Sequence, residues 1–242
     1  MSNIYTSSLP IMPISSEKKK IYIIRHGETE FNKLGLVQGS GVDTDLNDTG
    51  RYQAKCFYDA HKHLKFDKVY TSALRRTHQT VHLFLKNGIA WETLKGLNEI
   101  SWGNKEGKIL TAADDIQHHA MISGWKNGEL HLKSENGESP IEVQQRQKRA
   151  LSYIMNQTNE QNILICMHGR AMRIFLSLLL GKDMRFMDNF EHSNLSLYML
   201  EYKNGKFELK LHNDRRHLEK QEISQIVPKI AKELVEEVEL AY

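Results

Sequence analysis

The chain has 242 residues, 40% of them hydrophobic, and its 33 basic and 30 acidic side chains leave a formal net charge of +3. This size and composition favour one domain with a complete core. The near balance of charge gives no sign of a nucleic-acid partner, which would call for a strongly basic surface. Cys56 and Cys166 lie too far apart in the sequence for a disulfide framework, so we expect free thiols in a reducing compartment.

The two ends of the chain differ from its middle. Residues 1–18 hold two of the four prolines and several serines, and we expect a flexible N-terminal arm. The apolar residues of this arm precede the basic run 18–20, which is the reverse of a secretory signal. The longest apolar run, 174–180, is too short to span a membrane. These features predict a cytoplasmic protein with no membrane partner.

Strands and helices alternate along most of the chain. Short β-branched or aromatic runs predict strands at 20–24, 68–70 and 162–167, and two closing strands at 195–201 and 206–211 around an Asn-Gly turn. Capping residues and apolar spacing predict helices at 48–63 behind Asn47, at 73–86, at 140–156 and at 171–180. We therefore expect an α/β fold, a three-layer α/β/α sandwich around a mostly parallel sheet.

Two further segments complete the expected organisation. Residues 103–137 are polar and glycine-rich, and they predict a loop-rich cap excursion with one short helix near 111–123. Residues 216–242 carry apolar side chains at helical spacing and predict a C-terminal helical extension. That extension packs on its own domain or forms a dimer contact. The main domain is expected to span 19–215.

Chemically active side chains follow three of the expected strands. In open α/β sheets the functional site lies beyond the carboxyl ends of the strands. Here those ends carry Arg25-His26-Gly27, Thr71-Ser72 and His168-Gly169. A single histidine after a strand is more often structural than catalytic. The combination of the three ends therefore points to a site more strongly than any one of them.

These residue types suit phosphoryl transfer. A neutral imidazole is a competent nucleophile, and we assign that role to His26. The transferred group spreads its charge over three equatorial oxygens, which planar guanidiniums such as Arg25 and Arg76 bind well. His168 can donate a further hydrogen bond, best when protonated, and backbone N–H groups after Gly169 can add more. With so many donors, no metal or other cofactor is expected.

Several sequence blocks occur in a fixed order. They are Arg25-His26-Gly27-Glu28-Thr29-Glu30-Phe31-Asn32, Gln38-Gly39, Thr71 to Thr77, Leu97-Asn98-Glu99, Glu106-Gly107, Gly137-Glu138-Ser139 and Met167-His168-Gly169. In these blocks, from about residue 20 to 200, the chain resembles the histidine phosphatase superfamily, which includes the cofactor-dependent phosphoglycerate mutases. The resemblance implies a phosphoglycerate mutase-like fold and a phosphohistidine intermediate.

The resemblance also implies a role for each matching residue. The catalytic residues are His26, His168 and Glu99, with Glu99 protonating the leaving oxygen and later deprotonating water. The implied phosphate-binding residues are Arg25, Arg76, Asn32, Gly27 and Gly169. Further substrate contacts are expected from Thr29, Gln38, Gly39 and Arg170.

Arg170, the His118-His119 pair and Trp125 have two interpretations each, and Arg75 has one. Arg170 departs from the family, which has a small or neutral residue after His-Gly, so it either faces solvent or clamps a second acidic group. Arg75 is expected at the rim, because the pattern selects Arg76 for phosphate. His118-His119 is either a surface pair or a substrate contact, and Trp125 either packs the excursion down or stacks on substrate.

Three functions fit these observations. The short interval between Glu99 and His168 is similar to the phosphatase-type branch, in which an open site admits water and hydrolysis prevails. The alternatives are a cofactor-dependent phosphoglycerate mutase and a catalytically inactive phosphate-binding module. The expected partner is a small phosphorylated metabolite, and the protein is expected to be a monomer or a homodimer.

Overall fold

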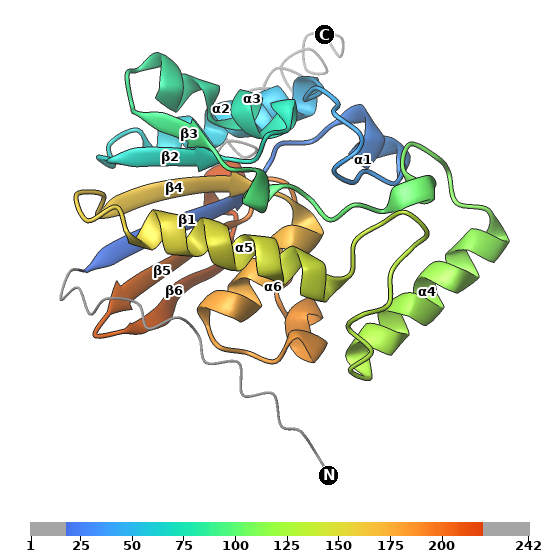
Figure 1. The fold of residues 1–242 in the computed structure, drawn as a ribbon. Coiled ribbons are helices and arrows are strands. Elements are labelled where there is room, and N and C mark those ends of the chain that lie inside the picture. Colours follow the sequence, from blue (N-terminus) through green and yellow to red (C-terminus); the bar gives the residue numbers. More distant parts are fainter. Residues whose placement is uncertain (1–17, 220–242) are drawn as a thin grey trace, which may run out of the picture.

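One six-stranded sheet forms the centre of the computed structural model, which describes residues 18–219 (Figure 1). Its strands are β1 (Lys19–Arg25), β2 (Lys68–Thr71), β3 (Trp91–Thr93), β4 (Asn162–Met167), β5 (Leu197–Lys203) and β6 (Lys206–Asp214). They are ordered β3-β2-β4-β1-β5-β6. The strands β1 to β4 are parallel, and β5 and β6 add an antiparallel hairpin beside β1. The predicted mostly parallel sheet is confirmed.

Helices cover both faces of this sheet. The α-helices are α1 (Glu30–Leu34), α2 (Asp48–His61), α3 (Arg75–Lys86), α4 (Ala112–Lys126), α5 (Pro140–Met155) and α6 (Gly169–Leu179). Three short 3-10 helices are η1 (Lys95–Leu97), η2 (Gly103–Lys105) and η3 (Met184–Asn189). In Figure 1, α2 and α3 lie on one side of the sheet and α5 and α6 on the other. This is the expected α/β/α arrangement.

The central part of strand β1, residues 21–24, shows why its sequence is a continuous apolar run. Ile21 and Ile23 pack in one core cluster with side chains of α5 and α6. Tyr22 and Ile24 point to the other face and pack with side chains of α2 and α3. A strand that is covered on both faces needs apolar residues at every position, so the run is continuous rather than alternating.

Local capping fixes where the helices begin. Asn47 accepts a hydrogen bond from the backbone N–H of Gly50 at 2.8 Å, as its N-cap position predicts. Helix α3 begins at Arg75 rather than at Ala73, because Leu74 is extended and its N–H donates to the hydroxyl of Ser72. The sequence interpretation missed α1 and β3, which have five and three residues.

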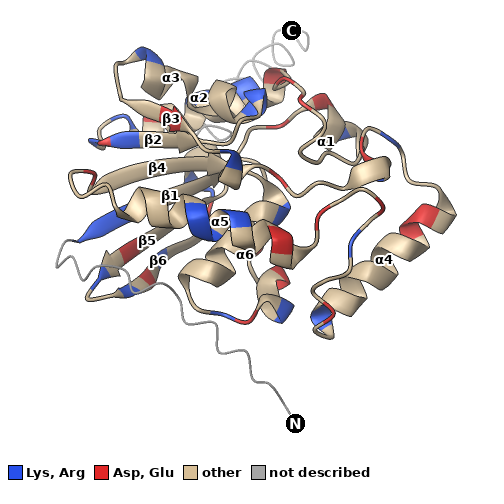
Figure 2. Cartoon of the chain, in the orientation of Figure 1, with Lys and Arg blue, Asp and Glu red and all other residues tan. Residues whose placement is uncertain are grey.

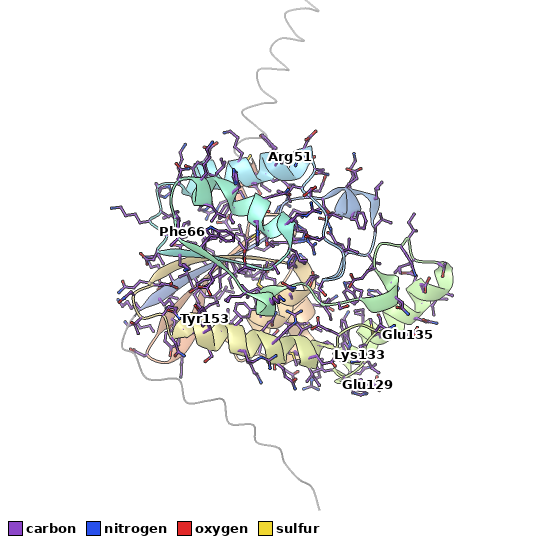
Figure 3. All side chains as sticks on the ribbon, turned by 45° about the horizontal axis from the view of Figure 1, so that its top comes forward. Arg51, Phe66, Glu129, Lys133, Glu135 and Tyr153 are labelled. Atoms are coloured by element: carbon purple, nitrogen blue, oxygen red, sulfur yellow. The ribbon has the colours of Figure 1, made fainter. Side chains whose placement is uncertain are left out.

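The excursion between β3 and α5 forms a cap beside the sheet (Figure 1). Its helix α4 is longer at its C-terminal end than predicted, and Trp125 on this helix is buried in a cluster with side chains of α5, α6 and η3. Trp125 also donates a hydrogen bond to the carbonyl of Leu132 at 2.9 Å, so it packs the cap down. The segment after α4 carries Glu129, Lys133 and Glu135, which lie near one another in Figure 3.

Two predicted segments lie almost entirely outside the described residues. These are the arm 1–18 and the extension 216–242, and both stay predictions. None of the helices within 18–219 combines the length and the apolar character that a membrane crossing requires.

Candidate active site

The carboxyl ends of three neighbouring strands bring the predicted histidines and arginines together. β1 and β2 both pair with β4, so the residues after these strands meet at one edge. The rings of His26 and His168 lie 5.1 Å apart, centre to centre. The Nε of Arg76 donates to Nδ1 of His168 at 3.2 Å.

His26 is held in the form that a nucleophile requires. Its side chain is buried, at 3% exposure, and its Nδ1 lies 2.8 Å from the carbonyl of Gly27. A carbonyl can only accept, so Nδ1 carries the proton and Nε2 keeps its lone pair. Burial, followed by the charges of Arg76 and Arg25, lowers the pKa of His26 well below its usual value. The imidazole is therefore neutral at physiological pH.

The surroundings of His168 favour the neutral form of its ring. Its Nδ1 accepts from Arg76, so its Nε2 carries the proton, which it donates to the Ser72 hydroxyl at 2.8 Å. Burial, Arg76 and His26 together lower the pKa of His168 well below its usual value. Burial among guanidiniums disfavours the charged form of this ring, and the role of His168 as a hydrogen-bond donor to the phosphoryl group stays a prediction.

The two predicted phosphate-binding arginines differ in how they are held. Arg76 is fully buried, and its Nη1 and Nη2 donate to the carbonyls of Val42 at 2.8 Å and Gly39 at 3.1 Å. Burial lowers the pKa of Arg76 to about 10, which leaves it charged at neutral pH. The Nε of Arg25 is buried and has no hydrogen-bond partner among residues 18–219. Arg25 therefore has an unused donor at this edge of the sheet.

Arg75 lies at the rim, as predicted. Its side chain is 57% exposed and forms ion pairs with Asp43 and Asp45, both at 3.3 Å. These aspartates belong to the segment whose carbonyls hold Arg76. The two adjacent arginines thus bind the same loop, Arg75 through its exposed aspartates and Arg76 through its buried backbone carbonyls.

The loop after β1 is tied together by its own polar side chains. Thr29 and Asn32 form a capping box at the start of α1, and both donate to the amide oxygen of Gln38, at 3.2 and 3.4 Å. Asn194 donates to the backbone carbonyl of His26 at 2.9 Å and to Asn32 at 3.2 Å. In this structure these groups order the loop around His26.

Gly27 has a steric reason for being glycine. A Cβ atom there would lie 2.6 Å from the backbone carbonyl oxygen of Gly50, closer than real Cβ contacts come. The N–H of Gly27 donates to the hydroxyl of Thr80 at 2.9 Å. Because residue 27 has no side chain, the loop after β1 can approach the backbone of α2 closely.

Glu99 occupies the N-terminus of α6. Its carboxylate is 6% exposed and accepts from the backbone N–H groups of Ala171 at 2.8 Å and Arg170 at 3.1 Å, and from its neighbour Ile100 at 2.9 Å. The N–H groups expected to bind phosphate therefore bind a carboxylate of the chain itself.

The side chain of Arg170 does not face solvent, and the acidic group that it binds belongs to the chain itself. It donates from Nη1 to Asp188 at 2.5 Å, and its guanidinium lies 5.4 Å from the ring centre of Trp125. Asp188 also accepts from Arg173, at 2.6 Å. Arg170 thus connects α6 to the cap, and its contact with substrate stays a prediction.

The paired histidines of α4 differ in their surroundings. His118 is partly buried, and its ring lies 5.2 Å from that of Trp102. His119 is exposed and lies beside Asp115. Only the first of the pair belongs to the packed side of the cap.

Three residues near this site were missed in the sequence. Asn194 contacts His26, Asp188 binds both arginines of α6, and His192 packs beside Gly169. All three lie in or next to the segment between η3 and β5, which carries no recognisable motif. Nothing in the sequence alone marks them, because only the antiparallel pairing of β5 with β1 carries this segment over the strand ends.

Charges are mixed over the described surface. In Figure 2 basic and acidic segments alternate over the helices and loops, without a face of one sign in that view. In the described part of the chain, no group of three or more His, Cys, Asp or Glu side chains is placed to hold a metal ion. The positive charge at the strand ends is therefore local to the site.

Comparison with known proteins identifies the family. The model of the histidine phosphatase superfamily (branch 1) matches residues 21–215. The adenosylcobalamin/alpha-ribazole phosphatase of Salmonella typhimurium is 30% identical over 165 residues, 66% of this chain and 79% of that protein. A protein of Erwinia tasmaniensis named "Probable phosphoglycerate mutase GpmB" is 29% identical over 67% of this chain and 75% of its own length.

A solved structure supports the same assignment. The alpha-ribazole phosphatase from Shigella flexneri has a TM-score of 0.71 and 27% identity, covering 81% of this chain and 96% of its own. The predicted fold class and the phosphatase type of enzyme are confirmed by these similarities. The chain belongs to branch 1 of the histidine phosphatase superfamily.

Proposed function

We propose that this protein hydrolyses small phosphomonoesters through a phosphohistidine on Nε2 of His26. The observation that carries the proposal is the neutral ring of His26. Its Nδ1 donates a hydrogen bond to the carbonyl of Gly27, so the lone pair on Nε2 is free to attack. The phosphatase relatives support the same reaction class. A covalent intermediate divides one difficult hydrolysis into two easier displacements.

In the first step the Nε2 lone pair forms a bond to phosphorus and the bond to the leaving oxygen breaks. Arg25 and Arg76 stabilise the charge on the equatorial oxygens. Glu99 enters this step protonated and gives its proton to the leaving oxygen. The backbone N–H groups of Arg170 and Ala171 then stabilise the carboxylate that forms.

In the second step water attacks the phosphohistidine. Glu99 takes a proton from this water, the bond between Nε2 and phosphorus breaks, and inorganic phosphate leaves. His168 stays neutral and fixes the Nε of Arg76. We assign supporting contacts with the phosphoryl group or the substrate to Asn32, Gly27, Gly169, Thr29, Gln38, Gly39 and Arg170.

Phosphoglycerate mutase activity is the second candidate, because one relative carries that name. A mutase must return the phosphoryl group to bound substrate, whereas a phosphatase must admit water. The chain's short interval between Glu99 and His168 favours the phosphatase. We further infer a cytoplasmic location and a monomer or homodimer, which fractionation and light scattering can test.

The direct test is turnover of p-nitrophenyl phosphate in the presence of EDTA, followed by a panel of sugar phosphates, phosphoserine and phosphoglycerates. We expect metal-independent release of phosphate. Interconversion of 2- and 3-phosphoglycerate without net phosphate release would favour the mutase.

Phosphate binding and ester turnover, measured together, separate an enzyme from an inactive module. A ligand at a hundred times its Kd stabilises the folded state by about 2.7 kcal/mol, so phosphate should raise the Tm of either. A phosphate-dependent Tm with no turnover of any ester in the panel would contradict the proposed enzyme and support the module.

A further inference from the structure

His192 approaches the site from a segment with no recognised motif. A Cβ atom placed on Gly169 would lie 2.7 Å from Cε1 of His192 and 3.6 Å from Nε of Arg25. The imidazole and the guanidinium therefore lie next to the same backbone atom, one residue after His168. Glycine at 169 leaves the space that this approach needs.

Two buried nitrogens near this point have no hydrogen-bond partner within residues 18–219. They are Nε of Arg25 and Nδ1 of His192. A buried polar group without a partner is unfavourable, and native structures contain few of them. The Arg25 nitrogen is always a donor, whereas a neutral imidazole nitrogen can accept. The two unpartnered atoms are thus complementary in chemistry.

The surroundings of His192 keep its ring neutral. Burial, followed by the charges of Arg25 and Arg173, lowers the pKa of His192 to about 3, with Asp188 acting weakly in the opposite direction. A neutral ring retains one nitrogen lone pair over the whole range in which a phosphatase would be assayed. It can therefore accept a hydrogen bond without adding positive charge beside Arg25.

We propose that His192 is a positioning residue that acts through Arg25. One water molecule accepts a hydrogen bond from Nε of Arg25 and donates one to Nδ1 of His192, which gives both atoms a partner. The contact holds the guanidinium so that its remaining N–H groups meet the phosphoryl oxygens. This role rests on the proposed function, because it assigns Arg25 to the phosphoryl group.

The choice of substitutions tests the nitrogen rather than the bulk of the ring. Asparagine can place a polar atom where Nδ1 lies, glutamine can place one where Nε2 lies, and leucine places neither. We expect His192→Leu and His192→Gln to lower kcat/KM by roughly 10- to 100-fold, as a misplaced catalytic group does. We expect His192→Asn to stay within about threefold of the unaltered protein. Equal losses in all three would overturn the assignment to Nδ1.

A double-mutant cycle tests whether His192 acts through Arg25. In an Arg25→Ala background, His192→Leu should cause no further loss of kcat/KM or of phosphate affinity. Losses that simply add would overturn the proposal, as would full activity in His192→Leu. Calorimetry of phosphate binding gives a second readout that does not require turnover. If no ester is turned over, the proposed function fails, and the phosphate affinities still test the role of His192.

His217 supplies a matched control. It is also a buried histidine, with a pKa lowered to about 4, but it packs against Phe57 and His61 on the α2 side of the sheet. His217→Leu should leave kcat/KM and phosphate affinity unchanged. Comparing its Tm with that of His192→Leu separates the loss of a buried imidazole from a loss of positioning.

Discussion

Replacing His26 by alanine should lower kcat for p-nitrophenyl phosphate by at least about 10⁴-fold, because the group that forms the covalent intermediate is gone. Phosphate binding should survive in part, since Arg25 and Arg76 remain. The fold should also survive, because the imidazole's hydrogen bond is a local one, to the carbonyl of the next residue, Gly27. The measurement is steady-state turnover with EDTA, together with Tm and phosphate affinity.

The covalent intermediate can be observed separately. Rapid quenching with base should trap a phosphorylated protein whose label is lost on acidification, as phosphohistidine requires, and peptide mapping should place it on His26. His82→Ala is the control, because His82 is exposed on α3 and should keep full activity. Normal turnover in His26→Ala, or a label on another residue, would contradict the proposed reaction.

Glu99→Gln should have the second-largest effect, and the effect should depend on the leaving group. An alkoxide needs a proton to leave, so kcat for alkyl phosphates should fall by about 10²- to 10⁴-fold. p-Nitrophenolate is a much weaker base and leaves without that proton. Its release should therefore stay fast in the first turnover.

The same variant should stall at the second step. Without Glu99 to accept a proton from water, the phosphohistidine should accumulate and p-nitrophenol should appear as a burst of one equivalent, followed by slow turnover. Stopped-flow absorbance measures the burst, and the quenched label measures the intermediate. Equal slowing for both classes of ester, with no burst, would show that Glu99 does not exchange protons.

The glutamine variant requires a check of its fold. Both carboxylate oxygens of Glu99 accept backbone N–H groups, and an amide offers only one acceptor atom. One hydrogen bond at the α6 N-terminus is lost, which costs about 1–3 kcal/mol. A Tm measurement distinguishes this loss from a catalytic effect.

Most of the sheet could be predicted because its signals are local. The run 163–167 is apolar throughout because β4 lies between two strands and is covered by helices on both faces. Asn47 marks a helix start through its own side chain. The strand Trp91–Thr93 has no such signal, because its first and last residues are exposed and its middle residue is only partly buried. Its pairing with β2 alone makes it a strand.

The site was predictable only where a residue belongs to a motif. His26, Arg76 and His168 follow strands whose carboxyl ends must meet in a parallel sheet. Their protonation could not be predicted, because burial among guanidiniums is a property of the folded protein. His192 and Asp188 depend on how the chain returns from α6 to β5, and neither spacing nor periodicity encodes that path.

The uncharged imidazoles also limit the acidity that the protein tolerates. His26, His168 and His217 are buried, and their folded pKa values all lie below the usual 6.5. In an unfolded chain each would take up a proton as the pH falls below about 6.5. Each therefore reduces the free energy of unfolding by up to about 1.4 kcal/mol for every pH unit below that value. The burial among arginines that keeps His26 and His168 neutral therefore also lowers the free energy of unfolding as the pH falls below about 6.5.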